Sequence, residues 1–315
     1  MLEDTHEQIR DRISNIQRDA PLANLEALFK DSSRRSSCSQ DQFVTYVRYI
    51  SVLIERFGGS IRICDIDDGT ADAFASWLYK RPLSEKNHST MSPNTYNKYL
   101  NGYTFIWNAV SGRIGLTTNP WEKIPRKKLD TSVRQVLTEQ ESDSILAYAK
   151  GEYRTLIAIG LYTGLRLGDC VHLRWCDIHD GAVFVEHTRK TGAPVAIPLH
   201  AKLRAILDEI DEREDQVVPD VCRLYDTQGS SPIVRTVKRI FTRCGVETSK
   251  TEQGKRARPV RGFHSLRSTF VTRCIAAGVP QAVVQALVGH ASSKMTQHYT
   301  HLDNKDIIGA FSRIS

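Results

Sequence analysis

Six polar residues in the second half of the sequence could together cleave a phosphodiester. They occur in a fixed order: Arg166, Lys190, His264, Arg267, His290 and Tyr299. Two arginines can grip the nonbridging oxygens of one phosphate, because a guanidinium stays charged and presents a planar fork of donors. A lysine and two histidines can donate or relay protons, and a tyrosine hydroxyl can attack phosphorus. The set predicts phosphoryl transfer without a metal or a cofactor.

The settings of the two arginines favour a shared phosphate. Arg166 ends the run Thr163-Gly164-Leu165-Arg166, which follows an apolar segment. His264 and Arg267 are three residues apart, so they project from the same face of a helix. A single arginine more often forms a surface or interdomain ion pair. The paired setting favours the phosphate clamp instead.

The proton donor and the nucleophile depend on their local segments. Lys190 lies at the tip of a predicted hairpin, where its long side chain could protonate a departing 5′ oxygen. Arg189 is a competing candidate for this role. Alternatively, Lys190 is an ordinary surface lysine of a hairpin turn. Tyr299 is the last of eleven tyrosines and lies in a short polar segment, where a core aromatic would be unusual. A phenol of pKa about 10 needs nearby cations to react. Attack by Tyr299 would leave a phosphotyrosine ester, so rejoining would need no ATP.

The histidines near the C-terminus also admit a zinc interpretation. The four that gather there are His264, His290, His298 and His301. No carboxylate or cysteine joins them at a recognised ligand spacing. We therefore expect no metal at this site.

The charge balance favours a polyanionic partner. The chain has 43 Lys+Arg against 36 Asp+Glu, a net charge of +7. Two basic clusters would suit a phosphate backbone, although ordinary exposed loops would account for them equally well. The predicted DNA contacts are Arg126, Lys127, Lys128, Lys255, Arg256 and Arg258.

Cysteine usage and hydropathy indicate the compartment. Seven cysteines are scattered without a CxxC pair, which predicts reduced, mostly buried thiols. The acidic start Met1-Leu2-Glu3-Asp4 and the lack of a long apolar segment predict no contact with a membrane. We expect a cytoplasmic, nucleoid-associated protein.

The first half of the chain is predicted to be helical. Residues 1–38 are expected to form a helical extension. Apolar residues from Phe43 to Phe57 recur at helical intervals, a shorter helix covers 70–80, and Ser92-Pro93 starts a long helix to Ile114. Residues 39–124 would form a bundle whose aromatic stripe packs its core. A charged linker, 125–135, would follow.

The remaining residues, 136–315, are predicted to form a mostly α domain with one small sheet. A β-hairpin is expected over 182–187 and 194–199, with its turn at Thr191-Gly192. The predicted helices cover 138–150, 153–162, 201–212, 232–243, 265–277, 280–288, 294–301 and 306–313.

These motifs closely resemble those of the tyrosine recombinases, the phage-integrase-like family. The resemblance starts near Ser39 and covers Thr-Gly-Leu-Arg at Arg166, the hairpin lysine, His-x-x-Arg at His264, Gly-His at His290 and the nucleophile Tyr299. It implies a SAM-like helical core-binding domain and a mixed α/β catalytic domain that form a C-shaped clamp on DNA. It also implies that Asp169 supports the site as a hydrogen-bonding partner.

The resemblance further implies the reaction and its assembly. The enzyme would cleave and rejoin DNA at paired inverted sites through a 3′-phosphotyrosyl intermediate, for integration, excision, inversion or dimer resolution. It would be a monomer or weak oligomer without DNA and a tetramer in the synapse. The apolar face Ile307, Ile308, Phe311 and Ile314 of the last predicted helix would dock on a neighbouring protomer, or else on its own core.

Two other functions compete with this interpretation. A type IB topoisomerase uses the same nucleophile and similar cations, but the helical N-terminal bundle and the apolar C-terminal tail favour the recombinase. A non-enzymatic DNA-binding regulator is suggested by 280–301, which superficially fits a helix-turn-helix. A regulator would not need the six polar residues together.

Overall fold

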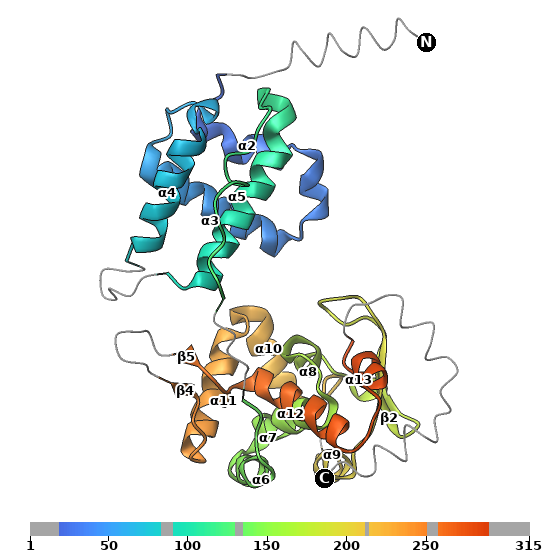
Figure 1. The fold of residues 1–315 in the computed structure, drawn as a ribbon. Helices are drawn as coiled ribbons and strands as arrows, with labels where there is room; N and C mark the ends of the chain where they lie inside the picture. Colours follow the sequence, from blue (N-terminus) through green and yellow to red (C-terminus); the bar gives the residue numbers. More distant parts are fainter. Residues whose placement is uncertain (1–18, 83–90, 130–134, 212–213, 251–257, 290–315) are drawn as a thin grey trace, which may run out of the picture. The chain divides into compact units, whose positions relative to one another are not determined.

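The described part of the protein is mostly helical and contains two small antiparallel sheets (Figure 1). The computed structural model describes residues 19–82, 91–129, 135–211, 214–250 and 258–289. Contacts divide the chain into two compact units, 1–131 and 132–315. The predicted helices over 294–301 and 306–313 and the helical start of the chain lie outside the described residues.

The first unit is a helical bundle. Its described α-helices are α2 (Leu25–Lys30), α3 (Gln40–Phe57), α4 (Asp68–Lys80) and α5 (Pro93–Ile114). Local sequence starts the longer helices: Ser92 caps α5 ahead of Pro93, as predicted. The Ser39 side chain and Gln42 form a reciprocal capping box at the start of α3, which was not predicted.

Aromatic packing fills the core of the first unit. Phe74, Tyr103, Trp107 and Trp121 are each at most 1% exposed. The stripe along α5 is therefore core, as its helical spacing predicts. Residues 1–38 were expected to form an extension, but 20–29 contribute to this same core.

The second unit has eight described α-helices. They are α6 (Glu139–Tyr148), α7 (Gly151–Thr163), α8 (Leu167–Val171), α9 (Ala201–Asp208), α10 (Pro219–Gln228), α11 (Ser231–Arg243), α12 (Phe263–Ala276) and α13 (Gln281–Leu287). Sequence periodicity did not predict α8 or α10. Five residues in α8 are too few to show a helical repeat. Helix α10 has only ten residues, a short window for a periodic signal.

The larger sheet contains the predicted hairpin. Strands β2 (Ala182–Val185) and β3 (Val195–Pro198) pair antiparallel, with Val183 opposite Ile197. A two-residue strand, β1 (Ile178–His179), extends the sheet beyond β2. A second sheet joins β4 (Ser249–Lys250) to β5 (Arg258–Pro259). Strands of two residues show no alternation, so β1, β4 and β5 were not predicted.

Close packing of α12 on α7 forms the centre of the second unit. The α7 side of this contact includes Gly160, where an added Cβ would lie 2.9 Å from Cζ of Phe263. Any larger residue would push the two helices apart. Helix α13 packs on α12 and on strand β3. The C-terminal ends of α7 and α13 both meet the side chain of Arg267 on α12.

All seven cysteines are free, but the expectation that most are buried is wrong. Cys170, Cys222 and Cys274 are buried, whereas Cys64 and Cys176 are exposed. The two exposed thiols lie in single-turn 3₁₀ helices at the surface. No helix in the described part of the chain is both long and apolar enough to span a bilayer.

Candidate active site

A buried arginine joins three helices of the second unit. Arg267 is 4% exposed, and its guanidinium donates hydrogen bonds to the carbonyls of Gly164 (2.8 Å) and Val288 (2.6 Å). These residues cap the C-terminal ends of α7 and α13. Helix C-terminal carbonyls lack intrahelical partners and carry partial negative charge, which suits a buried cation. The guanidinium is therefore held in one position.

Arg166 places a second guanidinium near enough for its charge to act on Arg267. Its Nη1 is buried and has no hydrogen-bond partner among the described residues. Burial lowers the pKa of Arg267 to about 10, and the charge of Arg166 acts in the same direction. The Arg267 guanidinium still carries its proton at neutral pH. Two adjacent cations with a free buried donor form a site for an anion.

The turn before Arg166 requires glycine for two reasons. Gly164 has φ +66°, in the left-handed region, and ends α7. A Cβ at this position would lie 2.5 Å from Cδ1 of Phe270 on α12. The hydroxyl of Thr163 donates to the Ile159 carbonyl and accepts the N–H of Leu165. The turn thus directs the chain into α8 while its Gly164 carbonyl accepts from Arg267.

Asp169 connects this region to the β2–β3 turn. It is 5% exposed, and Oδ1 accepts the backbone N–H of Arg189 at 2.8 Å. Its negative charge opposes the lowering of the Arg267 pKa. Its supporting role in the reaction stays a prediction. The contact shows that α8 and the turn carrying Lys190 are directly linked.

The turn itself is closed by local hydrogen bonds. The N–H of Gly192 donates to the Thr188 carbonyl at 2.7 Å, and the N–H of Thr188 donates to the Ala193 carbonyl at 3.2 Å. Gly192 has φ +69°. Lys190 is exposed at the tip. An exposed lysine on an anchored turn can approach a bound substrate from outside the protein.

The described residues contain only part of the predicted catalytic set. His264 is exposed in the first turn of α12, one turn before Arg267. Gly289, with φ +63°, follows α13 and leads to His290. His290 and Tyr299 lie outside the described residues. The structure thus brings together Arg166, Arg267 and the Asp169 carboxylate, and the catalytic roles remain predictions.

The predicted DNA contacts in the first unit also have structural partners. The Arg126 guanidinium donates to the carbonyls of Trp121 (2.9 Å) and Ile124 (2.7 Å), and burial lowers its pKa. Lys127 Nζ lies 4.2 Å from the ring centroid of Tyr79. Both side chains organise the last segment of the unit, so contact with DNA stays a prediction for them.

The other predicted contacts are less defined. Lys128 is exposed, and Arg258 lies in β5. Lys255 and Arg256 lie outside the described residues. The sequence did not predict that the Gly164 and Val288 carbonyls and the Arg189 amide bond to site residues. Every residue type has these backbone groups, so residue type does not indicate which of them take part.

Comparison with known proteins identifies the class. The model of the phage integrase family matches residues 135–306. An "Integrase/recombinase" of Escherichia coli is 25% identical over 298 residues, covering 82% of this chain and 83% of its own length. A "Tyrosine recombinase XerC-like" protein of Caldanaerobacter subterraneus is 23% identical over 75% of this chain and 69% of its own.

Solved structures share the fold. A lambda integrase dimer bound to a COC′ core site matches with TM-score 0.65 and 20% identity, over 90% of this chain and 76% of that chain. A lambda integrase tetramer bound to a Holliday junction matches with TM-score 0.60 and 18% identity, over 90% and 80%.

The chain belongs to the phage integrase family. It is a tyrosine recombinase, an enzyme of site-specific DNA recombination. The topoisomerase alternative gains no support from these relatives, which are named as recombinases and integrases.

Proposed function

We propose that this recombinase holds one DNA phosphate between Arg166 and Arg267 and cleaves it with Tyr299. The observation that carries the proposal is the buried Nη1 of Arg166, which lacks an acceptor among the described residues and lies beside a second guanidinium. A nonbridging phosphate oxygen supplies the missing acceptor. The two positive charges also stabilise the extra negative charge of a pentacoordinate phosphorus.

The remaining residues move protons in this proposal. The Tyr299 oxygen attacks phosphorus, the bond to the 5′ oxygen breaks, and the 3′ phosphate stays on the tyrosine. Lys190 gives a proton to the departing 5′ oxygen, while His264 and His290 bind phosphate oxygens or relay protons. A 5′ hydroxyl of another strand then attacks the ester and restores the tyrosine. The bond energy is conserved, so no cofactor takes part.

We further propose that residues 39–124 and 136–315 bind opposite sides of duplex DNA as a C-shaped clamp joined by the linker 125–135. The basic residues named above would contact the phosphate backbone. A tetramer on paired inverted sites would perform strand exchange, as lambda integrase forms a tetramer on a Holliday junction. The segment 306–313 would join neighbouring protomers.

The experiment that tests the nucleophile compares two tyrosines. Labelled duplex carrying the natural recombination site, nicked to trap the covalent product, is incubated with the full-length chain and run under denaturing conditions. Tyr299→Phe should form no protein–DNA adduct yet retain DNA affinity within a few-fold. Tyr148→Phe changes an exposed tyrosine, 51% accessible, and should retain the adduct. An adduct formed by Tyr299→Phe would disprove the assignment.

A further inference from the structure

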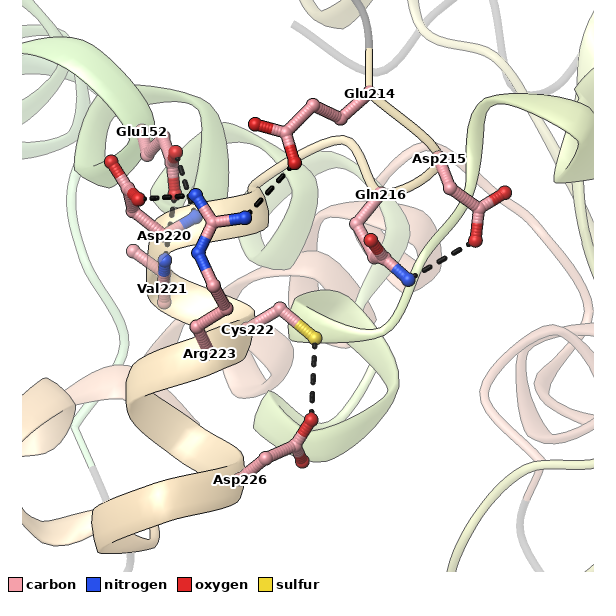
Figure 2. A network of polar contacts seen from close by, with 9 residues as sticks. All are labelled: Glu152, Glu214, Asp215, Gln216, Asp220, Val221, Cys222, Arg223 and Asp226. Carbon is pink, nitrogen blue, oxygen red and sulfur yellow. Dashed lines mark hydrogen bonds and ion pairs between the residues drawn. The ribbon is translucent and has the colours of Figure 1, made fainter.

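A histidine, a cysteine and an aspartate meet on the second unit. His172 caps the C-terminal end of α8, while Cys222 and Asp226 lie one turn apart on the same face of α10. Their nearest ligating atoms all lie within 4.8 Å of one another. His172 Nε2 is 2.9 Å from Asp226 Oδ1, and Cys222 Sγ is 3.8 Å from Asp226 Oδ2. Figure 2 shows the Cys222 thiol directed at the Asp226 carboxylate.

The histidine ring is oriented as a metal ligand would be. His172 Nδ1 lies 2.7 Å from the Gly168 carbonyl, which can only accept, so Nδ1 carries a proton. The other nitrogen, Nε2, faces the Asp226 carboxylate. At 2.9 Å this contact is a hydrogen bond, which a cation bound to both groups would replace. Zinc-binding histidines are commonly held by such a carbonyl on the opposite nitrogen.

We propose that His172, Cys222 and Asp226 bind a divalent cation of the zinc class, with water completing the site. Imidazole nitrogen, thiolate and carboxylate oxygen form a zinc donor set, with bonds of about 2.0–2.3 Å. Tetrahedral bonds of that length put ligand atoms roughly 3.3–3.8 Å apart. The observed separations bracket this range, so small side-chain rotations suffice.

Burial and charge suit entry and release of the ion. Asp226 is exposed, His172 is half-buried and Cys222 is buried, so the site opens to solvent on the carboxylate side. Burial, followed by the charge of Asp226, raises the pKa of the Cys222 thiol. Binding of the cation to the thiolate would release the thiol proton.

The cation would fix the segment that carries the phosphate clamp. Helix α8 follows Arg166 directly and contains Asp169, and its C-cap His172 would be joined to α10. Helix α10 is a fixed support: Glu152 accepts the N–H groups of Asp220 and Val221 at 2.9 and 2.8 Å (Figure 2). The ion takes no part in cleavage. Its effect is to hold α8 in place.

Cobalt is the probe, because a thiolate bound to Co²⁺ gives a charge-transfer absorption band. Tag-free, reduced, full-length protein is titrated with Co²⁺, and Zn²⁺ is then added. We expect a band that saturates near one equivalent and disappears with Zn²⁺. Cys222→Ser should abolish the band and His172→Gln should weaken Co²⁺ binding at least tenfold. Cys176→Ser should retain it, since Cys176 has a similar aspartate contact, 3.7 Å to Asp177, but joins no group of three possible ligands among the described residues.

Alkylation of the native chain gives an answer that does not depend on variants folding. Zn²⁺ should slow modification of Cys222 at least tenfold while exposed Cys176 reacts at the same rate with or without the ion. Three results would each overturn the metal site. They are alkylation of Cys222 at the same rate with and without Zn²⁺, no band at saturating Co²⁺, and a full band in folded Cys222→Ser. The cluster would then be a simple hydrogen-bonded pair of His172 and Asp226.

Discussion

Replacing Gly164 by alanine tests how the phosphate clamp is positioned. Gly164 ends α7 with φ +66°, and its carbonyl accepts a hydrogen bond from Arg267. The new Cβ would lie 2.5 Å from Cδ1 of Phe270, well inside contact distance. The Phe270 ring is 1% exposed and cannot move into solvent. Helix α12 or the turn must therefore shift.

Two costs add in this variant. An L-residue in the left-handed region costs about 1–2 kcal/mol. Forcing a carbon atom into a filled core adds about 1–3 kcal/mol. Gly164→Ala should therefore destabilise the second unit by about 2–5 kcal/mol. Gly151→Ala is the matched control, because Gly151 has φ +53° but no atom within 4 Å of its Cβ position. Gly151→Ala should lower the free energy of unfolding only by the cost of the left-handed backbone conformation, about 1–2 kcal/mol.

Hydrogen exchange of α12 amides in the full-length chain measures this difference. The slowest amides of α12 report unfolding of the second unit, and amides of α5 in the first unit serve as an internal reference. The shift at Gly164 should also displace the Gly164 carbonyl from Arg267. Covalent adduct formation should then fall by about tenfold or more per 1.4 kcal/mol lost from the aligned clamp.

The result that refutes the reasoning is equal destabilisation by the two glycine variants. It would mean that the Phe270 ring can move away from the new Cβ without lowering the free energy of unfolding. A double-mutant cycle with Phe270→Leu sharpens the test, because the smaller side chain removes the contact. Gly164→Ala should cost at least 1 kcal/mol less in the Phe270→Leu background, a coupling typical of residues in contact. Additive effects would count against a direct clash.

Three further substitutions test the site and its support. Arg267→Lys keeps the charge but cannot donate to both carbonyls, so single-turnover cleavage should fall about 10²–10³-fold while DNA affinity changes little; unaltered cleavage would remove Arg267 from the clamp. Asp169→Ala removes the acceptor of the part-buried Arg189 N–H, and urea unfolding should show a loss of about 0.5–1.5 kcal/mol; no loss would show that the contact is dispensable. Glu152→Ala removes the cap of α10 and should cost about 1–2 kcal/mol by the same measurement, whereas Glu209→Ala, which breaks an exposed ion pair, should cost under about 1 kcal/mol. Equal costs for the two glutamates would contradict the capping role.

Much of the local structure follows from short-range sequence. The caps at Ser39, Ser92 and Thr138 start α3, α5 and α6 because each side chain bonds a backbone N–H three residues ahead. The β2–β3 hairpin follows from strand alternation and a glycine turn. Such interactions reach only a few residues along the chain, so residue order alone predicts them. The motifs that indicate the recombinase family are also short runs of neighbouring residues, so the sequence shows them directly.

Tertiary structure decided the features that join distant segments. The acceptors of Arg267 lie 103 and 21 residues away, and His172 meets Asp226 across 54 residues. The ring of Phe270 makes glycine necessary at position 164, and neither residue type predicts that contact. Hydrogen bonds to backbone carbonyls depend on how helices pack, and many residue types can supply a carbonyl. The sequence by itself therefore indicated which residues could perform the chemistry, while packing of α7, α12 and α13 decided how the described arginines are held.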